Sequence, residues 1–370
     1  MPPRRFASLD FFRGLMLAVM AVDHLAGTAS PPCQLLGAVS AAEGFLFLSG
    51  VVVGFVYGRG ALEPARLRAR AFGRAGKLYR YHLVLLAVVI LLAFALPGVF
   101  GAAWRDHLPF LLEHPVVAAL LSLTFLNQPR FFDILPLYTL FLLATPWVLG
   151  ALARGRARLV LALSAGLWLL AQLGLQGFIL RQLPYYWKLQ PGSFDPFAWQ
   201  LLFVVGVWFG YGALQSRPVV PQGRAALLLA LAVALPLLAL RHGLRLEPPG
   251  FPYLQLEAMT NRAHLGWLRL LDFAAVALVL ARLVAWRPAL FQARWFVFLG
   301  RHSLQVFAAH VFALYLVTPL QWRVLEWGVW GGLLALLFVV LSLTLPALLH
   351  ERVLRERRAR AKAGAPLPQG

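Results

Sequence analysis

The sequence predicts an all-α polytopic membrane protein with about ten transmembrane helices and both termini in the cytoplasm. Hydrophobic residues make up 61% of the 370 residues and the mean hydropathy is +0.74, which is too apolar for a soluble protein. The apolar residues gather in runs of membrane-spanning length. Lys and Arg are concentrated in alternate connections between these runs, as the positive-inside rule requires.

Ten hydrophobic runs are expected to cross the bilayer as helices. They lie near 9–29, 41–58, 82–100, 132–153, 159–180, 197–215, 224–241, 267–286, 299–319 and 324–349. The apolar run 115–126 is too short to span, so we expect it to be interfacial or re-entrant. The first run carries Asp10 and Arg13 and no small-residue cleavage site follows it. We therefore expect a retained span and not a cleaved signal peptide.

The basic residues predict the orientation of these spans. One set of connections holds 23 Lys and Arg residues, whereas the alternate set holds 8. The basic set comprises the N-terminus, 59–81, 154–158, 216–224, 282–294 and the tail. This set should face the cytoplasm. The same rule accounts for the net charge of +20, which therefore needs no nucleic acid partner.

Several classes of protein lack support in the sequence. The single Cys33 allows no intramolecular disulfide and no cysteine-based metal cluster. No GxxxxGK[ST], GxGxxG, HExxH or GxSxG pattern is present. ATP-driven transport, a nicotinamide cofactor and zinc-dependent hydrolysis are therefore unsupported, and no metal is expected.

The segment 7–29 places four ionisable groups in or beside the membrane: Asp10, Arg13, Asp23 and His24. Such groups are costly there and usually functional. Arg13 and His24 are eleven residues apart, so they share one helix face and lie about 16 Å apart along its axis. The predicted orientation puts Arg13 toward the cytoplasm and His24 toward the outside. Snorkelling of each residue to its own interface is the alternative.

Two carboxylates could orient the His24 imidazole. Asp23 precedes it directly, and Glu43 opens the second span after a short loop. A carboxylate in contact with the ring would fix its tautomer and raise its basicity, as a general base requires. For Glu43, the alternative is an acid favoured by the dipole at a helix N-terminus.

Basic residues at near-helical spacing follow the second span. Arg66, Arg70, Arg74 and Lys77 would share one face of a cytoplasmic helix. They could bind the phosphates of an anionic cofactor, or they could contact anionic lipid as ordinary positive-inside charge.

Two predicted outer connections, 127–138 and 184–200, are rich in aromatic, amide and acidic side chains. These groups suit the apolar faces and hydroxyl edges of sugar rings, although the aromatic residues could equally form an interfacial belt. Asp133 and Asp195 each stand where a span begins, which an interfacial belt does not explain.

The later spans carry further polar residues. His310 lies in mid-span, where it reaches no interface, so it is either a packing residue bonded to a neighbouring helix or part of a reaction path. Arg269 and Asp272, at i and i+3, are expected to pair with each other.

Six stretches together resemble a known family. They are LDFFRG followed by Asp23 and His24, AAEGFLFLSG (41–50), GRAGKLYRYH (73–82), QPRFFDILPLY (128–138), DPFAWQLLF (195–203) and LGRHSLQVFAAH (299–310). They are similar to OpgC-type succinyltransferases of osmoregulated periplasmic glucans, which are related to the acyltransferase-three superfamily. The spacings from Arg13 to His24 and from Ser303 to His310 resemble that wider superfamily. Asp195 stands where the family pattern has an asparagine.

The resemblance implies an acyl-CoA-dependent O-acyltransferase of the bacterial inner membrane. It would move an acyl group, expected to be succinyl with acetyl as the alternative, from cytoplasmic acyl-CoA to hydroxyls of a periplasmic glucan or another extracytoplasmic glycan. His24 would be the general base or an acylated nucleophile. The remaining site residues implied are Arg13, Asp23 and Glu43 for catalysis, Arg66, Arg70, Arg74, Lys77 and Arg80 for acyl-CoA, and Asp10, Asp133, Asp195, Gln200, Ser303 and His310 for the acceptor or for support.

Residues 1–350 would then form a single transmembrane acyltransferase domain, and 351–370 a disordered basic cytoplasmic tail. The alternative function is a transporter or flippase, in which Arg13, His24 and His310 join Glu43 in an ion or proton path. A transporter would move its substrate without consuming acyl-CoA.

Overall fold

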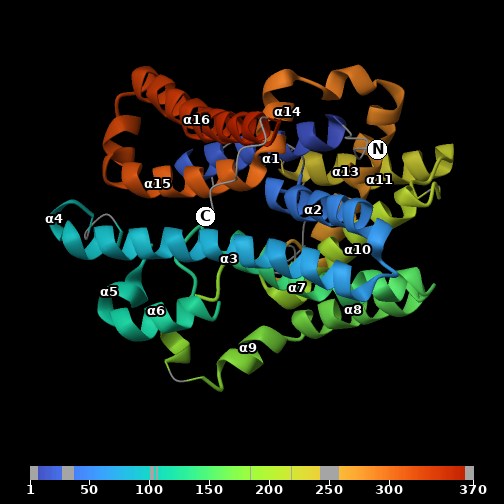
Figure 1. Cartoon of the computed structure of the whole chain (residues 1–370), viewed down its shortest axis with the longest axis horizontal. Coiled ribbons are helices and arrows are strands. Elements are labelled where there is room, and N and C mark those ends of the chain that lie inside the picture. The colour runs from blue at the N-terminus through green and yellow to red at the C-terminus, as the bar shows by residue number, and fades with distance from the viewer. Residues whose placement is uncertain are drawn as a thin grey trace.

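The computed structural model describes residues 7–26, 37–100, 104–105, 107–183, 185–217, 219–241 and 258–362. Within these ranges every regular element is a helix, which confirms the all-α prediction for them (Figure 1). Six of the described helices are long and apolar enough to cross a membrane. They are Ala41–Gly60, Pro64–Ala95, Ile134–Ala153, Pro196–Leu214, Ser303–Leu320 and Val329–Ala361.

The α-helices follow one another as α1 (Ala7–Ala26), α2 (Ala41–Tyr57), α3 (Pro64–Ala95), α4 (Pro97–Phe100), α5 (Pro109–Glu113), α6 (Pro115–Leu123), α7 (Ile134–Ala153), α8 (Ala157–Gln172), α9 (Leu175–Leu180), α10 (Pro196–Leu214), α11 (Arg224–Arg241), α13 (Trp267–Trp286), α14 (Arg294–Arg301), α15 (Ser303–Leu325) and α16 (Val329–Lys362). Short 3₁₀ turns lie at Gly58–Gly60, Tyr186–Lys188 and Pro288–Phe291. In Figure 1, α3 crosses the middle of the molecule, with α1, α14, α15 and α16 on one side and α5 to α9 on the other.

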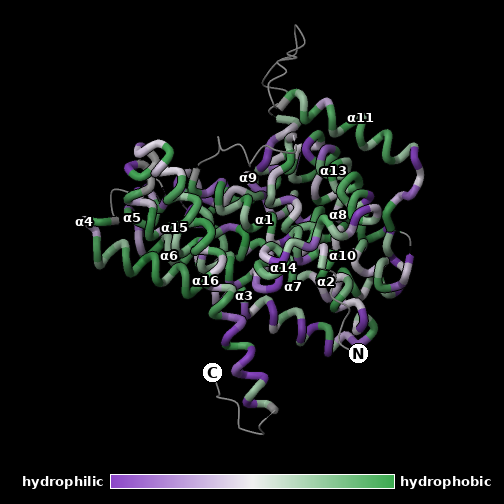
Figure 2. The backbone as a smooth tube through the Cα atoms, turned by 90° about the horizontal axis from the view of Figure 1, so that it is seen from above, coloured by the Kyte–Doolittle hydropathy of each residue, from purple (hydrophilic) through white to green (hydrophobic). Residues whose placement is uncertain are grey.

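The other four predicted spans coincide with helices that are shorter or more charged. They correspond to α1, to α8 with α9, to α11 and to α13. Ten spans with both termini in the cytoplasm therefore stay a prediction. In Figure 2, the hydrophilic start of α3 and the hydrophilic end of α16 lie on the same side of the molecule, as that prediction requires.

Three boundaries differ from the sequence expectations. The basic connection 59–81 belongs largely to α3, because its Ala, Leu and Arg residues favour helix. The run 159–180 breaks at Gly174, whose φ of 86° lies in the left-handed region that glycine adopts without cost. Residues 351–362, predicted to be disordered, continue α16, whereas 363–370 lie outside the described residues.

Helices α2 and α10 pack at very close range through glycine. A side chain at Gly50 or Gly54 would collide with backbone atoms of α10, and one at Gly206 or Gly210 would collide with backbone atoms of α2. Each helix therefore presents glycines four residues apart to the other, as membrane helices do when their backbones approach closely.

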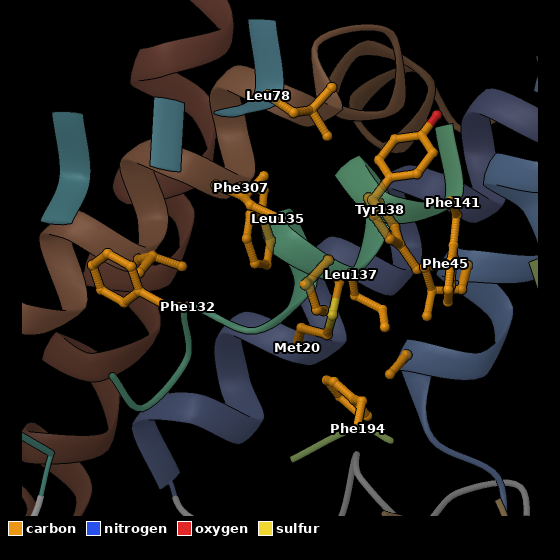
Figure 3. Packing of buried hydrophobic residues seen from close by; sticks show 14 of the residues in the cluster. Met20, Phe45, Leu78, Phe132, Leu135, Leu137, Tyr138, Phe141, Phe194 and Phe307 are labelled. Carbon is orange, nitrogen blue, oxygen red and sulfur yellow. The ribbon is translucent and has the colours of Figure 1, made fainter. Parts of the chain in front are cut away.

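Helix α1 packs against α14, α2 and α15. A side chain at Gly14 would collide with the backbone of Phe296, and one at Gly300 with the backbone of Asp10. This close crossing fixes the position of α1 relative to α14. Phe45 of α2 and Phe307 of α15 meet nearby with ring centres 6.4 Å apart, in the apolar cluster that Figure 3 shows.

Candidate active site

Arg13 and Ser303 meet where α1 lies beside α15. The Arg13 Nη2 donates a hydrogen bond of 2.6 Å to the Ser303 Oγ, although the two residues are 290 positions apart. The Nε of Arg13 is buried and has no partner in the part of the chain that the structure describes. The guanidinium carbon lies 6.0 Å from the centre of the Phe45 ring. Two predicted site residues are thus brought together, with one arginine donor left unused.

A small cavity of about 20 Å³, room for about one water molecule, opens beside Arg13. Its polar lining comes from Arg13, Arg74, Tyr138 and Ser303. Its apolar lining consists of Phe45, Leu78, Ile134, Leu135, Leu304 and Phe307. Among the described residues no carboxylate lines it, so the two arginines favour an anion there.

His24 and His310 lie together further along the same two helices. Their ring centres are 5.8 Å apart and their planes differ by 17°. The His24 Nδ1 and the His310 Nε2 are both buried, and neither has a hydrogen-bond partner among the described residues. A buried polar atom without a partner costs about 1–3 kcal/mol, so two such atoms on adjacent rings indicate a functional role.

The pairs at the two depths show that α1 and α15 run in the same direction. Arg13 precedes His24 in α1 as Ser303 precedes His310 in α15. The two pairs are separated by about 16 Å along the axis of α1. The structure therefore brings four of the predicted site residues into two matched levels.

Phe131 covers the His24 ring from the connection between α6 and α7. Its ring centre lies 4.4 Å from that of His24 and 5.6 Å from that of His107. Its φ is 71°, a left-handed conformation that is uncommon for an aromatic residue. Such backbone outliers cluster at functional sites. Phe131 lies in the stretch QPRFFDILPLY, on which the family resemblance partly rests. No local sequence signal predicts that a phenylalanine adopts a left-handed backbone conformation there.

A family model described as OpgC protein matches residues 4–355. The chain belongs to the OpgC protein family. Membership indicates a transferase of the glucan-modifying acyltransferase type. No curated protein and no solved structure matches the chain.

Glu43 of this OpgC-family chain does not reach His24. Its side chain is fully buried, one carboxylate oxygen accepting from the Ser40 backbone N–H at 2.9 Å and from the Ser40 Oγ at 2.6 Å. The other oxygen accepts from Arg269, so the expected Arg269–Asp272 pair is wrong. Asp272 instead accepts from the Ala38 N–H at 2.7 Å. The role of Glu43 visible here is to cap α2 and anchor α13.

The remaining acidic residues of α1 lie at its two ends. Asp10 lies 3.7 Å from the Arg301 Nε, which adds a charge pair to the crossing of α1 and α14. Asp23 stands half-buried directly before His24 in the last turns of the helix. The prediction that Asp23 orients the His24 imidazole stays a prediction.

The basic residues of α3 divide by exposure. Arg66, Arg70 and Arg80 are exposed, and Arg66 pairs with Glu63 at 2.9 Å. Arg74 and Lys77 are half-buried, and Arg74 lines the cavity beside Arg13. The cationic row therefore leads from the surface to the cavity.

Asp195 organises the start of α10. Its Oδ1 accepts from the Phe197 N–H at 2.8 Å as a helix N-cap, and its Oδ2 lies 3.2 Å from the His264 Nδ1. Its side chain is fully buried. An asparagine here could also cap the helix, but only a carboxylate can pair with a protonated His264.

Asp133 and Gln200 also join separate segments. Asp133 accepts from the Ser193 N–H at 2.7 Å, which ties the start of α7 to the connection before α10. The Gln200 amide exchanges hydrogen bonds of 2.6 and 2.8 Å with Ser164 of α8. These contacts join α7 to the connection before α10 and α10 to α8, and they join neither residue to His24.

Lys188, in the connection before α10, pairs with Glu113 of α5 at the protein surface. Its Nζ lies 2.5 Å from a Glu113 oxygen, and this ammonium lowers the pKa of Glu113. Among the described residues, no group of three His, Cys, Asp or Glu side chains could hold a metal ion. The candidate site thus consists of arginine, hydroxyl and imidazole groups.

Proposed function

We propose that this chain is an integral O-acyltransferase of the bacterial inner membrane. It takes an acyl group, succinyl in our proposal, from cytoplasmic acyl-CoA and transfers it to hydroxyls of a periplasmic glucan. The observation that carries the proposal is the matched pairing of α1 with α15, Arg13 with Ser303 at one depth and His24 with His310 at another. One helix thus offers an anion-binding level and a proton-accepting level.

The Arg13 level suits the donor. Coenzyme A carries several phosphates, and arginine binds phosphate through bidentate hydrogen bonds. The exposed basic residues Arg66, Arg70 and Arg80, with Lys77, would hold those phosphates at the cytoplasmic surface. Arg74 would guide the thioester arm toward Arg13, because it belongs to the same helix and lines the cavity.

The His24 level suits the chemistry. The neutral imidazole removes the proton of a glucan hydroxyl while that oxygen attacks the thioester carbon. A C–O bond forms, the C–S bond breaks, and the proton passes from His24 to the departing thiolate to give the free thiol. A positioned base contributes about 10² to 10⁴ in rate. Transfer through an acylated His24 is a variant of the same scheme.

The orientation of the proposed enzyme follows from charge. The Lys- and Arg-rich connections face the cytoplasm, so both termini lie there and His24 opens toward the periplasm. We also propose that the chain is related to the wider acyltransferase-three superfamily. The relationship rests on the two spacings, which the structure turns into the two contacts between α1 and α15.

Mass spectrometry of periplasmic glucans tests the proposed function. Cells would carry the intact gene, no gene, the His24→Ala variant or the control His114→Ala, which removes an imidazole beside Lys188 instead. We expect one succinyl increment per modified hydroxyl in the intact and control strains and its loss in the other two. An unchanged acylation profile without the gene, with altered uptake or export of a solute, would contradict acyl transfer and favour the transporter.

A further inference from the structure

We propose that His310 is the hydrogen-bond acceptor that orients His24 and that Ser342 of α16 sets the tautomer of His310. This inference rests on the proposed acyl transfer at His24. It assigns to a neutral imidazole the orienting role that the sequence analysis predicted for a carboxylate.

The hydrogen bonds of Ser342 determine the tautomer. The Ser342 Oγ donates to the Val339 carbonyl oxygen at 3.1 Å. A hydroxyl has only one hydrogen, so while the Oγ gives it to Val339, the same Oγ accepts from the His310 Nδ1, which lies 3.1 Å away. In this proposed arrangement, the Nδ1 of His310 carries the hydrogen. In the neutral ring this leaves a lone pair on Nε2.

The surroundings of His310 keep the ring neutral and its lone pair unused. Its side chain is only 2% exposed, and none of the described carboxylates forms an ion pair with it. A charged imidazole buried without a partner would be costly. Its Nε2 is buried and bonded to nothing described.

The position of that lone pair fits a role beside His24. The two rings are 5.8 Å apart and nearly parallel, and the Nδ1 of His24 is itself buried and has no partner in the described parts of the chain. Glu43 is occupied by Ser40 and Arg269, so it leaves the imidazole to other partners. The two nitrogen atoms do not bond each other in this structure, so the proposed step includes a rotation of either side chain that lets a His24 N–H donate to the His310 Nε2.

The proton balance of the step is complete with these groups. The hydroxyl oxygen gives its proton to His24 as the C–O bond forms and the C–S bond breaks. The resulting imidazolium has N–H groups on both nitrogens, and the one that faces His310 is accepted by the Nε2 lone pair. The acquired proton then leaves His24 for the thiolate, and both rings are neutral again.

Replacing His310 by Asn or by Gln separates this role from simple packing. Asn places an amide N–H near the Nδ1 position and keeps the bond to Ser342, but it has no acceptor at the Nε2 position. Gln places its amide group near the Nε2 position and supplies an acceptor there. Acceptor function therefore predicts that Gln is more active than Asn, whereas a packing role predicts the reverse.

The assay would use the full-length protein in detergent with succinyl-CoA and a purified glucan. We expect His310→Asn to lower kcat by about tenfold or more, with both KM values within about twofold of wild type, and His310→Gln to retain several times more activity than Asn. Ser342→Ala should lower kcat several-fold, and Ser342→Thr, which keeps the hydroxyl, should restore it.

The outcomes separate this inference from the proposed function. An active wild type in which Asn equals or exceeds Gln, or in which Ser342→Ala matches wild type, overturns the inference alone. A wild type without any transfer overturns the proposed function and this inference with it. Thermal unfolding of each variant identifies misfolding. If His310→Asn does not fold, the comparison of Ser342→Ala with Ser342→Thr decides.

Discussion

The two levels of α1 differ in chemistry although they share one helix face and the same partner helix. At the Arg13 level, two cations meet a hydroxyl and a small cavity without any described carboxylate. At the His24 level, two imidazoles and an aromatic ring meet, and two buried nitrogen atoms have no partner among the residues that the structure describes. The first arrangement favours binding of an anion, and the second favours movement of a proton. Because both levels lie on one helix, the distance between the anion-binding group and the proton-accepting group is fixed.

Acidic side chains make a further contrast with both levels. Glu43, Asp133 and Asp195 are buried, but their partners in other segments are Arg269, Ser193 and His264, and not the imidazole pair. These carboxylates join separate segments of the fold, and the proposed chemistry falls to arginine and histidine. The predictions below test that division.

The largest expected effect separates architecture from chemistry. Glu43→Gln breaks the buried pair with Arg269 and leaves its guanidinium, only 12% exposed, without its anion. We expect a loss of about 3–5 kcal/mol in the free energy of unfolding, measured by denaturation in detergent. The control Glu113→Gln breaks the exposed pair with Lys188 and should change stability very little. If Glu43→Gln stays stable but abolishes kcat in the folded protein, then Glu43 belongs to the chemistry after all.

A smaller effect is expected at the Arg13 level. Arg13→Lys keeps the positive charge but removes the planar guanidinium. The Nη2 of that group donates to Ser303, and its Nε has no partner among the described residues. We expect KM for acyl-CoA to rise by about tenfold, with kcat changed less, which corresponds to about 1.4 kcal/mol of binding. Steady-state kinetics with varied acyl-CoA measures it. A change confined to KM for the glucan would place the acceptor, and not the donor, beside Arg13.

The smallest effects are expected among the basic residues of α3. Arg74 lines the cavity, whereas Arg66 is 64% exposed and already paired with Glu63. Arg74→Ala should therefore raise KM for acyl-CoA several-fold, and Arg66→Ala should raise it by less than about twofold. Equal effects of the two variants in the same kinetic assay would show that the basic residues of α3 attract acyl-CoA through their summed charge. The cavity would then make no particular contribution to binding.

The sequence predicted the features that depend on local periodicity. The helical character of the chain follows from its apolar runs, and the shared face of Arg13 and His24 follows from their spacing. The spacing of Ser303 and His310 also marked residues that the fold brings to α1. The spacing of Arg66, Arg70, Arg74 and Lys77 predicted a helix, but its continuity with the following span as the single helix α3 was missed because its charges indicated a separate connection.

Contacts between distant segments could not be predicted in the same way. Arg269 has an acid three residues away, yet it pairs with Glu43, 226 residues distant, because the packing of α13 near α2 decides the partner. Ser342 is an isolated serine in an apolar helix, and only the approach of α15 to α16 gives it a role. Phe131 depends on a backbone conformation that no side-chain pattern encodes.

The most direct test of the two-level account is transfer across sealed membrane vesicles. Inverted vesicles would contain glucan in the lumen, with radiolabelled succinyl-CoA added outside, and right-side-out vesicles would serve as the matched control. We expect label on the lumenal glucan of inverted vesicles only, and none with His24→Ala. Equal labelling in both orientations, or labelling only when both substrates share one side, would contradict a site that joins a cytoplasmic donor to a periplasmic acceptor.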